Sequence, residues 1–219
     1  MIKAVIFDFD GTIVDTESLW YEVFKQTLSE DYGFELGLED FAQGIGTTDD
    51  ILFNYIDSKL GIQINRESVQ EKTEKAFQSQ RDILILREGI QDLIEKCIEK
   101  GLKLGVASSS GRDWVKHYLN HFGIEGHFQT LKTKEDVEKV KPDPALYIKA
   151  LEEMGVEPEE SLAIEDSVNG SIAAVQAGMH CAAVPNDVTH FLSFHEKVMR
   201  YKAFSEIPID ELITEKGKG

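Results

Sequence analysis

The segment Asp8-Phe9-Asp10-Gly11-Thr12 is the strongest constraint on what this chain can fold into. It follows the apolar run Val5-Ile6-Phe7, which has the composition of a buried β-strand. Residues i and i+2 of an extended chain project to the same side, so Asp8 and Asp10 are expected to face one site. The segment therefore predicts two carboxylates at the end of a strand, next to a glycine turn.

The two carboxylates also predict a chemistry. Two such groups close together cannot both ionise at low cost, so the pKa of one should rise unless a cation lies nearby. The pair can supply a nucleophile or metal ligand together with a general acid or base. Gly11 permits a steep turn that leaves N–H groups free for an anion, and Thr12 adds a hydroxyl. Phosphate and a hard cation are thus indicated, although a turn of this composition also occurs without any chemistry.

The composition excludes several classes of partner. The 219 residues are 42% hydrophobic, which is enough for one large core or for a core with a smaller unit beside it. Acidic side chains number 40 against 23 basic ones, and the net charge of -17 opposes binding to nucleic acid or to an anionic membrane surface. No stretch approaches the roughly 18 apolar residues of a membrane span. We expect a monomer with no nucleic-acid or membrane partner.

Cysteine usage and the N-terminus bear on the compartment. The chain has two cysteines, Cys97 and Cys181, far apart and each in an apolar setting. This pattern predicts buried free thiols and neither a disulfide framework nor a zinc site. The apolar run before Asp8 is too short for the core of a signal peptide. Both observations favour a cytoplasmic protein.

Residues 16–82 have the pattern of a helical bundle. Three apolar stripes with the 3.6-residue period of a helix occur there without an obvious strand between them. The stripes are Trp20, Val23, Phe24 and Leu28; Leu52, Tyr55, Ile56 and Leu60; and Val69, Thr73, Ala76 and Phe77. Each stripe needs a partner to cover it, so the three helices are expected to pack against one another.

From Leu84 onward, helical patterns alternate with short apolar strands. Strands are predicted at 102–107, 128–131, 161–164 and 181–184, the last being the final strand. Helices are predicted at 90–98, 115–122, 143–154 and 167–177. Such alternation predicts an α/β fold with a Rossmann-like parallel sheet and helices on both faces. The predicted domains are a discontinuous core, 1–15 and 83–219, and an inserted all-α cap, 16–82.

Chemically useful side chains follow the predicted strands. Ser108 follows one strand, Glu165 and Asp166 follow another, and Lys141 lies in the loop Val140-Lys141-Pro142-Asp143-Pro144. Each has an ordinary explanation as a helix cap, a solvated lysine or an acidic helix N-terminus. Ligands of parallel sheets bind beyond the carboxyl ends of the strands. The convergence of a nucleophile, an acid/base, a hydroxyl and a cation at that edge favours a catalytic site.

With these motifs the chain resembles the haloacid dehalogenase superfamily of phosphotransferases over essentially its whole length. The matching segments are Asp8-Phe9-Asp10-Gly11-Thr12, Ser108, Lys141-Pro142-Asp143-Pro144, Ile164 to Gly170, Ala173-Ala174 and Ala177-Gly178-Met179. Their order and spacing match, as does a helical insertion after the first motif. The chain is most similar to members with a helical cap that act on sugar phosphates, including beta-phosphoglucomutase.

The resemblance implies roles for individual residues. Asp8 would attack phosphorus and become an aspartyl-phosphate, while Asp10 would protonate the leaving alkoxide and then deprotonate the attacking water. Mg²⁺ would be held by Asp8, the main-chain carbonyl of Asp10, and Asp166, with Glu165 as a further or outer ligand. The residues expected to bind the phosphoryl oxygens are Gly11, Thr12, Ser108, Ser109 and Lys141.

The resemblance also places substrate selection in the cap. The residues expected to choose the substrate are Gln43, Gly44, Ile45, Gly46, Thr47, Asp49 and Trp20. The mutase pattern has a basic residue near Asp49 and a histidine where Trp20 stands. An acidic loop cannot hold the distal phosphate of a bisphosphate well, so hydrolysis is favoured over mutase activity. Trp20 has an alternative explanation as part of the bundle core.

Three functions remain to be compared. The first is a Mg²⁺-dependent phosphatase for a small phosphorylated metabolite such as a sugar or polyol phosphate. The second is a phosphomutase of the beta-phosphoglucomutase type. The third is a phosphoaspartate signalling module, which also uses acidic residues and a lysine at strand ends. The long insertion after Asp10 argues against a signalling module, which needs only the core.

Overall fold

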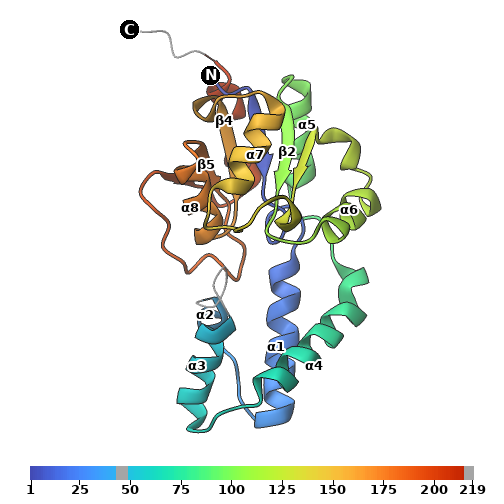
Figure 1. The fold of residues 1–219 in the computed structure, drawn as a ribbon, viewed down its shortest axis with the longest axis vertical. Helices are drawn as coiled ribbons and strands as arrows, with labels where there is room; N and C mark the ends of the chain where they lie inside the picture. The colour runs from blue at the N-terminus through green and yellow to red at the C-terminus, as the bar shows by residue number, and fades with distance from the viewer. Residues whose placement is uncertain (43–48, 215–219) are drawn as a thin grey trace.

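The computed structural model describes residues 1–42 and 49–214. Within them, six strands form one sheet in the order β3-β2-β1-β4-β5-β6, and every neighbouring pair is parallel (Figure 1). The strands are β1 (Ala4–Phe7), β2 (Lys103–Ala107), β3 (Thr130–Lys132), β4 (Ser161–Glu165), β5 (His180–Ala183) and β6 (Val198–Arg200). The predicted Rossmann-like α/β sheet is confirmed.

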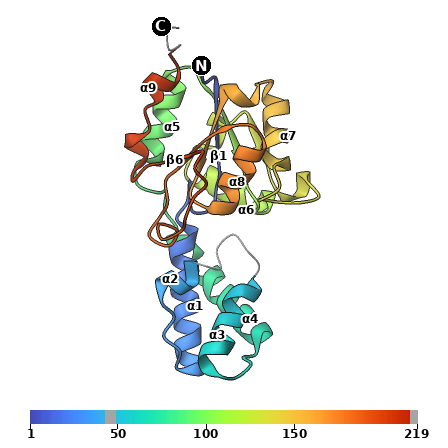
Figure 2. The same ribbon diagram turned by 90° about the vertical axis from the view of Figure 1, so that its left-hand side faces the viewer.

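Helices cover both faces of this sheet. Figure 2 shows α5 and α9 on one side of the strands and α7 and α8 on the other. The α-helices of this part of the chain, including α6, have the following bounds: α5 (Ile90–Glu99), α6 (Arg112–His121), α7 (Ala145–Met154), α8 (Val168–Gln176) and α9 (Ile209–Leu212). Short 3₁₀ helices are η1 (Arg81–Ile83), η2 (Glu125–His127), η3 (Lys134–Asp136), η4 (Pro158–Glu160) and η5 (Phe204–Glu206).

The two faces of the sheet have separate apolar cores because side chains alternate along a strand. Val5 and Phe7 of β1 pack into the cluster that contains Ile94 of α5. Ile6, between them, packs into the cluster that contains Leu146 of α7. All three strand residues are fully buried, as expected for a central strand of a parallel sheet.

Among the described residues, four α-helices lie between β1 and α5 in the sequence, before the short η1. They are α1 (Thr16–Tyr32), α2 (Leu38–Ala42), α3 (Asp49–Leu60) and α4 (Arg66–Gln80). Figure 1 shows them together below the sheet, beyond the edge at which β1 ends. Their apolar stripes form a third cluster that includes Phe24, Leu28, Phe53, Ile56 and Val69. The three predicted helical stripes are therefore helices, and α2 is an addition that the sequence pattern did not predict.

The chain leaves the sheet and returns to it through two segments that lie side by side. Val14 and Leu86 form an antiparallel bridge. The Asp15 N–H donates to the carbonyl of Ile85 at 3.2 Å, and the Arg87 N–H donates to the carbonyl of Ile13 at 3.0 Å. These bonds connect the beginning of the helical insertion to its end.

The C-terminal region corrects the prediction that 181–184 is the last strand. Val198–Arg200 forms β6, which pairs with β5 at the edge of the sheet. A strand of three residues is too short to show a period of two, so its pairing partner rather than its sequence determines it. Cys97 and Cys181 are buried free thiols, as predicted. Among the described residues, no helix has the length and apolar character that crossing a membrane requires.

Candidate active site

Three acidic residues meet at the carboxyl edge of two neighbouring strands. Asp8 directly follows β1, and its N–H donates to the carbonyl of Ile164 in β4 at 2.9 Å. Glu165 is the last residue of β4, and Asp166 follows it. The sheet runs from β1 to β2 on one side and to β4 on the other, so this edge is the topological switch point at which parallel sheets bind ligands.

Lys141 brings a positive charge to these carboxylates from the loop before α7. Its Nζ donates to Asp8 Oδ1 at 2.5 Å and to Glu165 Oε1 at 2.7 Å. Burial disfavours the charged form of Lys141, but attraction to the two carboxylates outweighs this and raises its pKa above the ordinary value. The lysine is therefore a fixed cation and not a solvated surface residue: only 6% of its side chain is exposed.

The acidic cluster has the donor set of a hard-cation site. Asp8, Glu165 and Asp166 each offer a carboxylate oxygen within 4.8 Å of the others, and all three are buried. Burial is the main cause that raises the pKa of Asp8 to about 7 and the pKa of Asp166 well above its usual range. One lysine cannot neutralise three carboxylates. All-oxygen donors with uncompensated negative charge fit Mg²⁺.

Asp166 is held by neutral donors and by a glycine turn. Its Oδ1 accepts from the Thr12 hydroxyl at 3.3 Å, and its Oδ2 accepts from Asn186 Nδ2 at 2.8 Å. Gly11 has a φ of 75°, and a Cβ on it would lie 2.3 Å from Asp166 Oδ2. Glycine at this position is thus needed both for the turn and for the space that the carboxylate occupies.

Glu165 is fixed from the opposite side. Tyr147 donates to its Oε1 at 2.5 Å, and the Ser167 hydroxyl donates to its Oε2 at 3.3 Å. A Cβ on Gly170 would lie 2.0 Å from both carboxylate oxygens, so α8 has room for Glu165 only because it carries a glycine there. Ser167 also caps α8 by accepting from the Gly170 N–H at 3.1 Å.

Asp10 has a different set of partners from Asp8. Its Oδ2 accepts from the hydroxyls of Ser110 at 2.6 Å and Ser108 at 3.4 Å, and its Oδ1 accepts from Trp114 Nε1 at 2.9 Å. Burial raises the pKa of Asp10, and these three hydrogen bonds act in the opposite direction. β1 ends at Phe7, so the alternation of an extended strand does not control where the Asp10 side chain points.

The remaining predicted residues have mixed surroundings. Ser109 is exposed, between the two serines that contact Asp10. Trp20 is half-buried: its ring stacks on Phe77 with ring centroids 4.0 Å apart, as expected for a residue of the bundle core, and part of its side chain stays exposed, as substrate selection would require. Residues 43–48 lie outside the described part of the chain, which leaves the predictions for Gln43, Gly44, Ile45, Gly46 and Thr47 untested. Asp49 begins α3, and its side chain also lies outside the description.

Several residues at this edge were not predicted. Glu17, in the first turn of α1, is half-buried with a pKa raised to about 8, first by burial and then by repulsion from Asp10 and Asp8. Asn186 lies just after β5, and the rule that ligands bind at strand ends would have found it. Ser110 lies in the loop between β2 and α6, and Trp114 lies in the first turn of α6. No sequence signal distinguishes them from capping and packing residues.

Comparisons with known proteins agree with the resemblance that the sequence motifs indicated. The model of the haloacid dehalogenase-like hydrolase family matches residues 5–184. YhcW of Bacillus subtilis (strain 168), whose name classes it provisionally as a phosphatase, is 41% identical over 214 residues, covering 97% of each chain. This chain belongs to the haloacid dehalogenase-like hydrolase family.

Other proteins that are similar to this chain support the predicted enzyme class. Hexitol phosphatase B of Escherichia coli (strain K12) is 28% identical over 187 residues, with 84% of each chain covered. The crystal structure of CbbY from Rhodobacter sphaeroides in complex with phosphate has a TM-score of 0.72 and 28% identity, and the match covers 95% of this chain and 97% of that one. The protein is an enzyme, a phosphoric monoester hydrolase of this family, as its motifs predicted.

Proposed function

We propose that this enzyme hydrolyses a small sugar or polyol phosphate through an aspartyl-phosphate on Asp8, with Mg²⁺ as its cofactor. The observation that carries the proposal is the buried group of Asp8, Glu165 and Asp166, with Lys141 hydrogen-bonded to the first two. The kinship with a hexitol phosphatase supports the substrate class.

Asp8 is proposed as the nucleophile because it combines a strand-end position with a cationic partner. A carboxylate that approaches a phosphate dianion is repelled, and each pair of unit charges about 4 Å apart costs about 4 kcal/mol at an effective dielectric of 20. Lys141 offsets part of this repulsion. Phosphoryl transfer depends mainly on positioning and charge neutralisation, and the buried Lys141–Asp8 pair provides both.

Asp10 is proposed as the acid and then the base. It lies two residues from the nucleophile, and hydroxyl and indole donors fix both of its oxygens. Burial raises its pKa, so a larger fraction of the metal-free enzyme carries the proton that the leaving group needs. Ser108, Ser109 and Lys141 are proposed to bind the phosphoryl oxygens. The N–H groups of Gly11 and Thr12 were predicted to be free for an anion, but they donate to the carbonyls of Val14 at 2.8 Å and Phe9 at 3.3 Å.

The residues proposed to hold Mg²⁺ are Asp8, Asp166 and the main-chain carbonyl of Asp10, with Glu165 as a further or outer ligand. When bound, the ion would neutralise phosphate charge and orient the phosphoryl group toward the nucleophile. Glu165 already accepts from Lys141 and Tyr147, which supports the outer position. The Asp10 side chain is directed to Ser110 and Trp114, which leaves its carbonyl as the group available for the ion.

The helices α1 to α4 are proposed to act as a cap over the site, with the core at 1–15 and 83–219 and the cap at 16–82. The paired segments around Val14 and Leu86 support this division because the chain crosses between the two parts only there. Trp20, Asp49 and the loop 43–47 are proposed to select the substrate. We propose a monomeric, cytoplasmic enzyme that takes no nucleic acid, in keeping with the net charge of -17.

The test is release of inorganic phosphate from 4-nitrophenyl phosphate and from a panel of hexitol, hexose and glycerol phosphates. We expect turnover that requires Mg²⁺, stops on chelation and is absent in Asp8→Asn. Turnover that survives Asp8→Asn would remove the assigned nucleophile. Isomerisation of β-glucose 1-phosphate with a bisphosphate primer, without phosphate release, would replace hydrolysis by a mutase reaction. A stable phosphoprotein that does not turn over would indicate a signalling module.

A further inference from the structure

The two oxygens of Asp10 face donors of different kinds. Oδ1 accepts one hydrogen bond, from Trp114 Nε1 at 2.9 Å. Oδ2 accepts from Ser110 Oγ at 2.6 Å and lies 3.4 Å from Ser108 Oγ. The indole donor belongs to α6 and the serines to the loop before it, so three donors from one stretch of chain enclose a single carboxyl group.

This difference decides where a proton on Asp10 can reside. An indole N–H can donate a hydrogen bond but cannot accept one, so Trp114 favours Oδ1 as the unprotonated carbonyl oxygen, which is the better acceptor of a carboxylic acid. A serine hydroxyl can rotate and change from donor to acceptor. The protonated form of Asp10 therefore carries its proton on Oδ2, next to Ser110 and Ser108. Without the indole N–H, either oxygen could carry it.

We propose that Trp114 is a positioning residue for proton transfer, whose indole N–H directs the acidic proton of Asp10 to Oδ2. The inference rests on the proposed function, in which Asp10 protonates the leaving group. In that step the bond from Asp8 to phosphorus forms, the bond from phosphorus to the leaving oxygen breaks, and the proton on Oδ2 passes to that oxygen. Asp10 is left as a carboxylate that accepts from Trp114 and from the serines.

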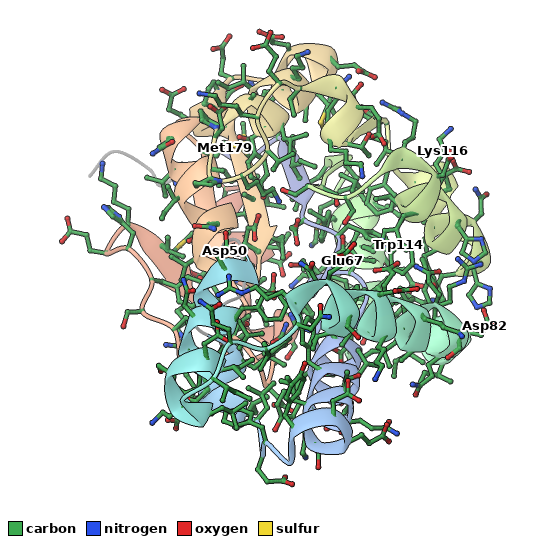
Figure 3. The ribbon with its side chains drawn as sticks, turned by 60° about the horizontal axis from the view of Figure 1, so that its bottom comes forward. Asp50, Glu67, Asp82, Trp114, Lys116 and Met179 are labelled. Atoms are coloured by element: carbon green, nitrogen blue, oxygen red, sulfur yellow. The ribbon has the colours of Figure 1, made fainter. Side chains whose placement is uncertain are left out.

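Aromatic contacts with the inserted helices hold the Trp114 ring in place. Its ring centroid lies 5.7 Å from that of Phe77 in α4 and 4.7 Å from that of Tyr118. Figure 3 labels Trp114 where α6 approaches α4. Phe77 in turn stacks on Trp20 of α1, and the Tyr118 hydroxyl donates to the carbonyl of Arg81 just after α4. Packing explains the position of the Trp114 ring, but it does not explain why the indole N–H is directed at the carboxylate of Asp10.

Trp114→Phe separates these two roles, because phenylalanine keeps a packed aromatic ring and removes the donor. The readout is kcat/KM for 4-nitrophenyl phosphate and for the alkyl phosphate that the wild type hydrolyses best in the panel above. An aryl oxide leaves with little help from an acid, whereas an alkoxide needs a proton. Because kcat/KM reports the steps up to phosphoryl transfer, we expect the alkyl value to fall at least tenfold more than the aryl value.

The matched control is Tyr118→Phe, which alters the ring next to Trp114 and its hydroxyl bond to Arg81 without touching Asp10. We expect it to change both substrates in parallel. A Trp114→Phe enzyme whose aryl and alkyl values fall equally, or not at all, would overturn the positioning role. A wild type that releases no phosphate from either substrate would instead overturn the proposed function.

A second measurement does not depend on the folding of a tryptophan variant. The chain has two tryptophans, so the indole N–H signals of Trp20 and Trp114 can be resolved and assigned by NMR. Asp10→Asn keeps an oxygen for Trp114 and places its NH₂ group toward the serines, as in the protonated acid. We expect the Trp114 signal to move upfield as its acceptor loses charge, with Trp20 little changed. An unmoved Trp114 signal would contradict the hydrogen bond.

Discussion

Lys141 donates to Asp8 Oδ1 across 2.5 Å, from a position 133 residues further along the chain. The same ammonium group lies 2.7 Å from Glu165 Oε1. Within residues 1–42 and 49–214, no other basic side chain forms an ion pair with the cluster of Asp8, Glu165 and Asp166. One buried lysine therefore balances much of the negative charge of the site. We expect both the stability of the folded protein and its catalytic activity to depend on this lysine.

Replacing Lys141 by methionine should lower activity and stability together. The side chain keeps its apolar length, but two buried carboxylates lose their cation, which costs about 3–5 kcal/mol of folding free energy. We expect kcat/KM for the aryl phosphate to fall at least about 100-fold, since a cation next to the transferring phosphate is lost. Denaturant unfolding and steady-state kinetics measure the two effects.

The matched control for that change is Lys139→Met, in the same loop but on an exposed lysine. Its unfolding free energy should stay within about 0.5 kcal/mol of the wild type. Adding Glu165→Gln to Lys141→Met should restore part of the stability but none of the activity. A Lys141→Met protein as stable as the wild type would show that the carboxylates do not need this lysine.

Magnesium should stabilise the folded protein through the same carboxylates. A ligand at 100 times its Kd adds about 2.7 kcal/mol, which corresponds to a rise in Tm of about 5–11 °C for a chain of this size. Asp166→Asn should remove most of this rise, because the neutral amide is a poor ligand that still accepts from Thr12. Thermal melts with and without Mg²⁺ check this. Equal shifts in the wild type and Asp166→Asn would place the ion elsewhere.

The parts of the site that follow strands could be predicted from the sequence. Asp8 and Asp166 each come directly after a strand, and parallel strands bring such positions to one edge whatever the intervening loops do. Lys141 was predicted from its motif, but its bonds to both Asp8 and Glu165 depend on the path of the loop before α7. A local sequence pattern does not reveal such a path, because the path is set by packing between distant segments.

The partners of Asp10 show a second limit. The i to i+2 spacing predicts that Asp8 and Asp10 face one site, but β1 ends at Phe7 and the chain then turns. Asp10 is consequently oriented by Ser110 and Trp114, which come about 100 residues later in the chain. A serine near the start of a helix and a tryptophan on its buried side have ordinary roles as capping and packing residues. Only the tertiary structure distinguishes these from polar contacts at a site.

Gly170→Ala should destabilise the protein even though alanine favours helices. Alanine in a helix is ordinarily better than glycine by about 1 kcal/mol. Here the new Cβ would lie 2.0 Å from both oxygens of Glu165, so the carboxylate must move away from Tyr147 and Lys141. We expect a net loss of about 2–4 kcal/mol, measured by denaturant unfolding, and a fall in activity.

Gly126→Ala is the control for that substitution, because nothing lies within 4 Å of the Cβ that it would add. Its stability should equal or slightly exceed that of the wild type. If Gly170→Ala also left the free energy of unfolding unchanged, Glu165 would have room to shift. Its hydrogen bonds with Tyr147 and Lys141 would then not be needed for stability.

Glu17→Gln should change how the stability of the metal-free enzyme depends on pH. The folded carboxyl has a pKa of about 8 against an ordinary value of 4.5, so between these values the folded state binds more protons than the unfolded state. Stability then falls as the pH rises from about 4.5 to 8. Since Glu17 is half-buried, solvent screening limits the loss to about 1 kcal/mol. In chelator, Glu17→Gln should match the wild type at pH 5 and melt about 2–4 °C higher at pH 8.5.

The matched control is Glu22→Gln, on an exposed residue of the same helix, which should show no such difference from the wild type. Curves of Tm against pH that run parallel for Glu17→Gln and the wild type would refute the raised pKa of Glu17.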